Sequence, residues 1–109
     1  MDLATAVYRL TLESPLARHF ALIDQIRRSA VSIPSNIAEG YGLGTKPQLV
    51  RTIRIALGSA RELDIQLQIV GRLELVDTNF LIPLSDLCSS VIGMLTNLLK
   101  SLGSQFEQW

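Results

Sequence analysis

The sequence is poor in the residues on which catalysis and metal binding usually depend. Its 109 residues include one cysteine, one histidine and one tryptophan. Charged residues make up 18% of the chain, with ten basic and ten acidic side chains, so the net charge is zero. A balanced charge gives no general attraction to nucleic acid or membranes, and any such binding needs a local patch. So few charges leave the surface short of polar cover, which favours an oligomer.

The single cysteine and the single histidine restrict the chemistry further. Cys88 cannot form an internal disulfide, which fits a reducing compartment, and no basic neighbour within a helical turn lowers its pKa. His19 shares its helical face with apolar residues and no carboxylate. Glu39 and Glu62 are the alternative metal ligands, but di-metal helical bundles need Glu-x-x-His pairs. We therefore expect no metal site, no cofactor, no catalytic residues and no enzymatic activity.

Targeting and membrane signals are also missing from the sequence. The amino terminus lacks the basic and apolar regions of a signal peptide. No apolar run approaches the ~18–20 residues that a membrane span needs. We expect a cytoplasmic protein without a membrane partner. Its length predicts a single domain over residues 1–109, large enough to bury a core.

Apolar periodicity predicts a short helix and a long one in the first half of the chain. The short helix covers residues 2–12 and ends before Pro15. The second begins near residues 16–18 and continues to about Gly40. Pro34 falls inside it, which predicts a kinked continuous helix, with a break at Pro34 as the alternative. The glycines expected to supply its C-cap and loop are Gly40, Gly42 and Gly44.

Two more long helices follow. The third has Thr45 as its N-cap and ends near Arg72, and the fourth follows a cap at Asp77 or Thr78 and stops at Gly103. Apolar positions of the third helix alternate four and three residues apart: Leu49, Ile53, Ala56, Ala60, Leu63, Leu67 and Val70. Gly58 costs this helix ~1 kcal/mol, which predicts a close-packed neighbour on its side. The predicted fold is all-α, an up-down four-helix bundle with a short first helix.

Arginines supply the candidate binding site. Four of them on the third helix lie within ~80° of one another, opposite its apolar seam: Arg51, Arg54, Arg61 and Arg72. A guanidinium group offers phosphate oxygens a planar fork of donors. The candidate nucleic-acid-binding residues are Arg27, Arg28, Arg51, Arg54 and Arg61. The alternative is a solvated helix face whose arginines pair with carboxylates such as Glu62 and Asp64.

Two other features allow more than one interpretation. Ser32, Ser35, Asn36 and Glu39 form either a polar recognition surface or a set that accommodates Pro34 and holds the helix against its neighbours. The broad apolar stripe of the last helix, together with Phe106 and Trp109, favours a protein-interaction scaffold. A protein partner is therefore the alternative to RNA or DNA.

Three segments carry a resemblance to a known family: YRLT at residues 8–11, QIRRSAVSIPSNIAEG at 25–40 and IALGSAREL at 55–63. They resemble the four-helix-bundle (S23-like) proteins encoded within intervening sequences of bacterial 23S rRNA genes, which are similar to the accessory proteins of diversity-generating retroelements. The resemblance implies a ring, typically a homopentamer, with nucleic acid and a reverse transcriptase as partners of the retroelement members. Family members usually carry more helix before the YRLT segment, so here that end of the core is exposed or covered by a neighbour.

Overall fold

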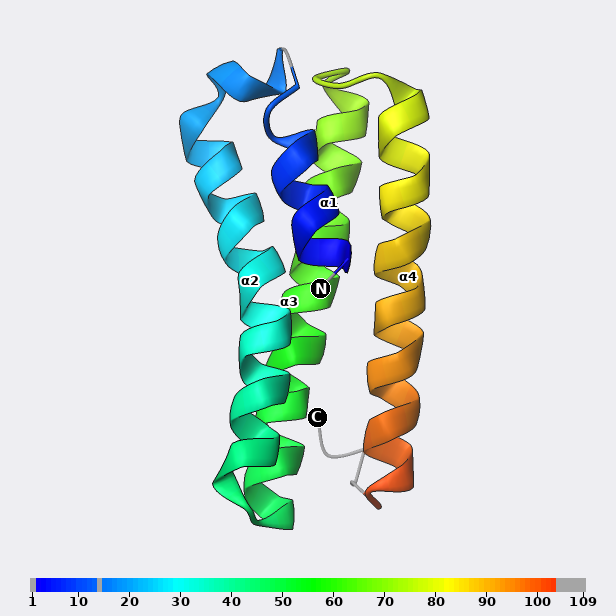
Figure 1. The fold of residues 1–109 in the computed structure, drawn as a ribbon. Helices are drawn as coiled ribbons and strands as arrows, with labels where there is room; N and C mark the ends of the chain where they lie inside the picture. The colour runs from blue at the N-terminus through cyan, green and yellow to red at the C-terminus, as the bar shows by residue number, and fades with distance from the viewer. Residues whose placement is uncertain (1, 14, 104–109) are drawn as a thin grey trace.

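The computed structural model describes residues 2–13 and 15–103, and every regular element in these ranges is a helix. The elements are α1 (Asp2–Leu10), a 3₁₀ turn (Leu16–Arg18), α2 (Phe20–Leu43), α3 (Lys46–Arg72) and α4 (Thr78–Ser101). Three long helices run alternately down and up, and α1 covers only the upper half of the space between α2 and α4 (Figure 1). The predicted four-helix bundle with a short first helix is confirmed. Phe106 and Trp109 lie outside the described residues.

Local capping explains where α3 and α4 begin. Thr45 caps α3, because its Oγ1 accepts a hydrogen bond from the Gln48 backbone N–H at 3.4 Å. Asp77 caps α4 by accepting from the Asn79 N–H at 2.8 Å. The predicted cap at Thr45 is confirmed, and of the two candidates for α4 the cap is Asp77 and not Thr78. The end of α2 lies three residues beyond the predicted Gly40, because the left-handed backbone that favours glycine occurs at Gly44 (φ 82°).

Helix α2 runs without interruption through Pro34, so the continuous helix is correct and the break is not. Asn36 braces the turn around the proline. Its Nδ2 donates to the Ser32 carbonyl oxygen at 2.8 Å and to the Ser32 hydroxyl at 3.0 Å. These bonds, together with packing against α3, offset the hydrogen bond that the proline removes.

Helix α3 lies at the centre of the core, packed against both α2 and α4. Its predicted apolar seam is buried except at Leu49, which is half-buried. Leu63 and Leu67 have no exposed surface. Each such side chain contributes about 1.5–3 kcal/mol to stability. Because α2 and α4 cover two sides of α3, only the remaining side of this helix is exposed.

Small and polar residues line the contact between α2 and α3. The Ser29 hydroxyl donates to Glu62 Oε1 at 3.3 Å, and the Ser59 hydroxyl donates to Ser32 Oγ at 2.8 Å. Further down, Gly40 faces Thr52. The segments at 25–40 and 55–63 therefore face each other. Ser32 joins α2 to α3, and Asn36 bonds within α2 beside Pro34, so the structural interpretation of these two residues is confirmed.

The close approach at Gly40 leads to a stability prediction. A Cβ at this position would overlap the Thr52 side chain and lie 3.0 Å from Leu49 Cδ1. Gly40→Ala should therefore lower the free energy of unfolding by about 1–3 kcal/mol, although alanine is the better helix former. Gly42→Ala, in the same helix with nothing within 4 Å, should raise it by up to ~1 kcal/mol. Urea denaturation followed by circular dichroism measures both, and changes of the same sign would contradict the close approach.

Helix α4 carries more apolar surface than the chain covers. Among the described residues it alone is long and apolar enough to cross a membrane by length and composition, with a mean hydropathy of 1.4. Core helices of soluble proteins pass the same test, so this is weak evidence for a span. Only 17% of its most apolar stretch is buried. The uncovered part is a candidate contact surface for a partner.

Candidate functional site

The arginines of α3 lie on one side of the helix, away from the core. Arg51 and Arg61 are exposed, and Arg54 between them is half-buried. Ten residues separate Arg51 from Arg61, which places them ~15 Å apart along the helix axis. Neither of these two forms an ion pair with any residue that the structure describes. Their guanidinium groups are therefore accessible to phosphate oxygens.

The carboxylates that were the alternative partners of these arginines are engaged elsewhere. Glu62 accepts hydrogen bonds from Ser29 at 3.3 Å and from Gln66 at 3.4 Å. Asp64 accepts from Gln68 at 3.2 Å. These carboxylates thus support the helices and do not neutralise Arg51 or Arg61.

Arg27 is turned toward α1. Its Nε donates to Thr11 Oγ1 at 2.9 Å, and its guanidinium carbon lies 4.7 Å from the centroid of the Tyr8 ring. Thr11 in turn donates to the Tyr8 carbonyl oxygen at 2.7 Å. A cation–π contact of this kind contributes roughly 0.5–2 kcal/mol. Arg27 therefore fastens α1 to α2, a role that the sequence analysis missed.

Arg28 points into solvent and pairs with Asp24, one turn earlier in α2, at 2.9 Å. An exposed pair of this spacing contributes only about 0.3–0.5 kcal/mol, so Arg28 remains accessible. Because Ser29 faces Glu62, Arg28 lies near the height of Arg61 along the bundle. The structure thus divides the five candidate residues into two groups. Arg51, Arg54 and Arg61 on α3 are here called the arginine row, and Arg27 and Arg28 lie on α2.

The outward face of α3 carries a second apolar seam, here called the outer stripe: Ile55, Gly58, Ile65 and Ile69. The isoleucines are 42%, 59% and 41% exposed, respectively. Together with Glu62 these positions alternate three and four residues apart, which is the spacing of a helix contact. A Cβ at Gly58 would find nothing within 4 Å, so the neighbour predicted beside this glycine is not supplied by the described part of the chain. The spacing of these residues is visible in the sequence, whereas the exposure of their side chains is not.

Cys88 is fully buried, and its thiol donates to the Ala60 carbonyl oxygen at 3.3 Å. Burial, with a smaller effect of the Asp64 charge, raises the pKa of the Cys88 thiol to about 11. This is not the environment of a nucleophile, because the thiolate is disfavoured.

The raised pKa of Cys88 predicts slow thiol chemistry and a pH-dependent stability. Native protein should react with Ellman's reagent at pH 8 far more slowly than protein unfolded in urea. Between pH 9 and about 11 the unfolded thiol loses its proton and the folded one keeps it, so stability should fall as pH rises. Cys88→Ala should remove that part of the pH dependence in urea denaturation. Equal reactivity of native and unfolded protein would contradict the buried thiol.

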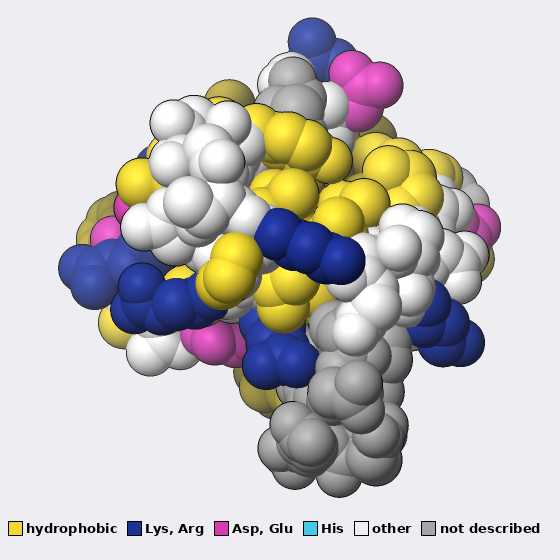
Figure 2. Space-filling view, turned by 90° about the horizontal axis from the view of Figure 1, so that it is seen from below, with side chains coloured by type: hydrophobic (Ala, Val, Ile, Leu, Met, Phe, Trp, Pro, Cys, Tyr) yellow, Lys and Arg dark blue, Asp and Glu magenta, His cyan; other side chains and the backbone are white. Residues whose placement is uncertain are grey.

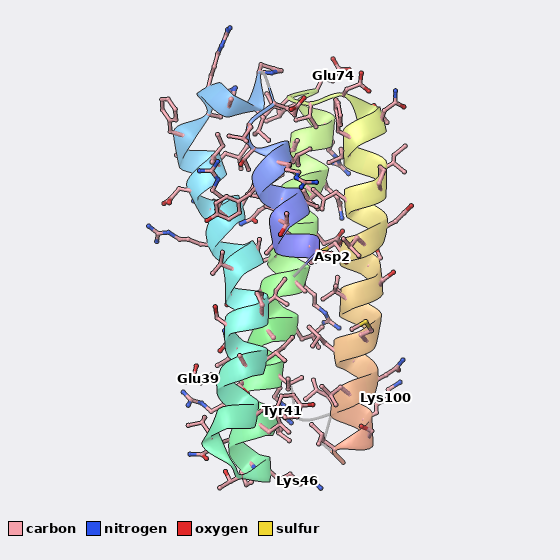
Figure 3. All side chains as sticks on the ribbon, viewed as in Figure 1. Asp2, Glu39, Tyr41, Lys46, Glu74 and Lys100 are labelled. Atoms are coloured by element: carbon pink, nitrogen blue, oxygen red, sulfur yellow. The ribbon has the colours of Figure 1, made fainter. Side chains whose placement is uncertain are left out.

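No described residues form a group of three or more His, Cys, Asp or Glu side chains that could hold a metal ion. Glu39 and Glu62, the metal ligands considered from the sequence, are not brought together. Glu39 lies on the outer surface of the lower part of α2 (Figure 3), whereas Glu62 faces Ser29.

A mainly apolar groove lies between α1 and α4. Its volume is about 500 Å³. The apolar lining residues are Ala6, Leu10, Leu12, Phe80, Pro83, Leu84 and Leu87. Arg9 and Glu13 also line it. It exists because the short α1 leaves one side of α4 incompletely covered.

These features define a small helical-bundle protein whose distinctive side chains lie on helix faces and along helix contacts. The model of the 23S rRNA-intervening sequence protein family matches residues 1–97. The chain therefore belongs to that family, and the resemblance of the segments at 8–11, 25–40 and 55–63 to 23S rRNA intervening-sequence proteins is confirmed. A comparison with curated proteins gave no match.

Proposed function

We propose that this protein is a non-enzymatic, oligomeric helical bundle that binds RNA or DNA through the arginine row of α3. The observation that carries the proposal is the exposure of Arg51 and Arg61 without an ion pair to any described residue. Their separation of ~15 Å corresponds to about four base pairs along a duplex. Arg54 lies within the row and Arg28 extends it onto α2, while Arg27 acts by holding α1 in place.

Assembly is the second part of the proposal, because one copy carries no net charge and only a small basic patch. The outer stripe of α3 has the spacing and the exposure of a helix contact, and it supports packing between copies. By resemblance to the family, the assembly is a cytoplasmic homopentameric ring. Arg61 lies ~80° around the helix from Ile69, whereas Arg51 lies in line with Ile69. The arginine row would therefore run from the line of each subunit contact to its edge, and it would be repeated by the symmetry of the ring.

The test is binding of a labelled RNA hairpin and a mixed-sequence DNA duplex at rising salt, with the mass of the protein measured by light scattering. Phosphate binding by arginines predicts affinity that falls with salt, with a log–log slope of about −0.9 per phosphate contacted on duplex DNA. The family name associates these proteins with 23S rRNA, so RNA is the first probe. A well-formed oligomer that binds neither nucleic acid at low salt would refute the proposal.

The apolar surface of α4 supports a second candidate, a scaffold for a protein partner. The groove of about 500 Å³ between α1 and α4 would accept apolar side chains of such a partner. Binding through this groove would be insensitive to salt, which distinguishes it from binding through the arginine row. The likeness to accessory proteins of diversity-generating retroelements is compatible with either role, because those proteins contact both nucleic acid and a reverse transcriptase.

A further inference from the structure

A hollow of about 520 Å³ lies where α1 meets α2, and it is here called the α1–α2 hollow. Its lining residues are Tyr8, Asp24, Arg27, Arg28, Val31 and Ser32. None of them lines the groove between α1 and α4. Pockets that bind small molecules measure about 300–1,000 Å³, so the hollow has the size of a ligand site. It is open to solvent, because the Arg28 side chain is 78% exposed and Val31 is 41% exposed.

One wall of this hollow is a fixed, flat surface made by Tyr8 and Arg27. The Arg27 guanidinium carbon lies 4.7 Å from the centroid of the Tyr8 ring, and Arg27 Nε donates to Thr11 Oγ1 at 2.9 Å. Thr11 is buried and Arg27 is half-buried, so both contacts hold the guanidinium group in place. Tyr8 is still 43% exposed. Proteins stack unpaired bases on aromatic rings and guanidinium planes, and a surface that is already ordered loses little entropy on binding.

Positive charge lies beside this flat surface. Arg28 follows Arg27 in α2 and pairs with Asp24 at 2.9 Å in an exposed ion pair. Such pairs contribute little to stability, so a phosphate group can compete with Asp24 for the guanidinium group. Two arginines and one aspartate give the lining a net charge of +1. The hollow therefore offers a flat surface for a ring and a cation for a phosphate, which are the two recognisable parts of a nucleotide.

We propose that the α1–α2 hollow binds one unpaired nucleotide of an RNA strand, with the base stacked on the Tyr8–Arg27 pair and the phosphate bound by Arg28. The inference rests on the proposed nucleic-acid binding and narrows its substrate class to RNA with a bulge or a loop. A fully paired duplex keeps its bases inside its own stack, whereas an unpaired base can turn outward onto a protein surface. Arg27 thus has two roles, because the contact that fastens α1 also builds the stacking surface.

The matched probes are a labelled RNA duplex with one bulged adenosine and the same duplex without it. Their affinities for the protein are compared by fluorescence anisotropy at one salt concentration. Stacking of a base on an aromatic side chain changes affinity by about 5- to 100-fold. The bulged duplex should therefore bind about tenfold more tightly than the fully paired one.

Two substitutions of Tyr8 and one control assign this preference to the hollow. Tyr8→Leu should abolish the difference between the two RNAs, whereas Tyr8→Phe keeps the ring and should retain the difference. Tyr41→Leu is the matched control, because Tyr41 is 60% exposed and lines a different hollow together with Lys46. Tyr41 and Lys46 lie at the lower end of the bundle (Figure 3), where basic side chains lie beside hydrophobic ones (Figure 2). Circular dichroism verifies that all three variants fold.

Substitutions in the exposed ion pair test the phosphate contact without changing a packed residue. Arg28→Gln should weaken binding of the bulged duplex by about tenfold, because it removes a charged hydrogen-bond donor. Asp24→Asn should strengthen binding, because Arg28 loses its competing partner. Asp86→Asn makes an equal change of charge at an exposed position of α4 and should have a smaller effect. Equal effects of the two aspartate substitutions would contradict the phosphate contact.

The outcomes separate this inference from the arginine row. Equal affinity for the two duplexes would overturn the inference and leave the arginine row standing, because that row does not require an unpaired base. Equal effects of Tyr8→Leu and Tyr41→Leu would overturn it as well. A preference for the bulge that depends on Tyr8 but persists in Arg51→Gln/Arg61→Gln would support the hollow. If the total affinity also persisted in that variant, the arginine row would be refuted and the hollow retained.

Discussion

Replacing Arg51 and Arg61 together with glutamine should weaken binding of an RNA hairpin or DNA duplex by about 100-fold. Hydrogen bonds to charged groups contribute about 1.5–3 kcal/mol each, and 1.4 kcal/mol corresponds to a factor of ten. The log–log salt slope should become shallower by about two units for duplex DNA. Both side chains are exposed on α3. Glutamine keeps their approximate length and helix propensity, so the fold should not change.

A matched pair of arginines separates a local effect from a change in net charge. Arg9 and Arg18 are exposed on α1 and the 3₁₀ turn, away from the arginine row. Arg9→Gln with Arg18→Gln removes the same two charges and should change affinity much less. Equal weakening by both pairs would show a general charge effect and contradict the arginine row. Unchanged binding in Arg51→Gln/Arg61→Gln would place recognition elsewhere.

The parts of the fold that depend on local physics were predictable from the sequence. Thr45 and Asp77 are caps because their side chains accept hydrogen bonds from the backbone of the following turn. The four-and-three spacing of α3 predicted its buried seam. The end of α2 was misplaced at Gly40, because the sequence does not reveal that this glycine is required by the side chain of Thr52. A glycine that permits close packing and one that ends a helix look alike in a sequence.

The site was less predictable, because its geometry depends on which helices meet. Arg27 contacts Tyr8 and Thr11, which precede it by more than fifteen residues and lie on another element. No spacing rule within one helix would find that contact. As a result, two adjacent arginines that the sequence treats alike have different environments: Arg27 holds α1, whereas Arg28 faces solvent.

Two of the segments that identify the family, 25–40 and 55–63, join α2 to α3. Ser29 and Ser32 of the first bond to Glu62 and Ser59 of the second. Family membership is therefore informative about the fold, whereas the proposed binding surface includes Arg61 inside the 55–63 segment and Arg51 outside it. In the proposed assembly the outer stripe connects fold and function, because the number of copies that it joins sets how often the arginine row is repeated.

Ile65→Asp combined with Ile69→Asp should dissociate the proposed oligomer to the 12.0 kDa chain in light scattering. Burying an unpaired carboxylate in an interface costs several kcal/mol, and each subunit contact would contain two. Both side chains are largely solvated in one copy, so circular dichroism should show an intact bundle. Gly58→Leu should act in the same direction by preventing close approach of a neighbouring helix, since a single copy leaves open space there.

Met94→Asp provides the control for assembly, because Met94 is exposed on α4 and lies off the outer stripe. It should leave the mass unchanged, and the opposite pattern would assign the contact between copies to α4. Dissociation should also reduce nucleic-acid binding, although neither isoleucine contacts phosphate in the proposed arrangement. Linked copies bind with a high effective concentration, and single copies lose that advantage. Loss of assembly with fully retained affinity would show that one arginine row is sufficient and that the ring serves another purpose.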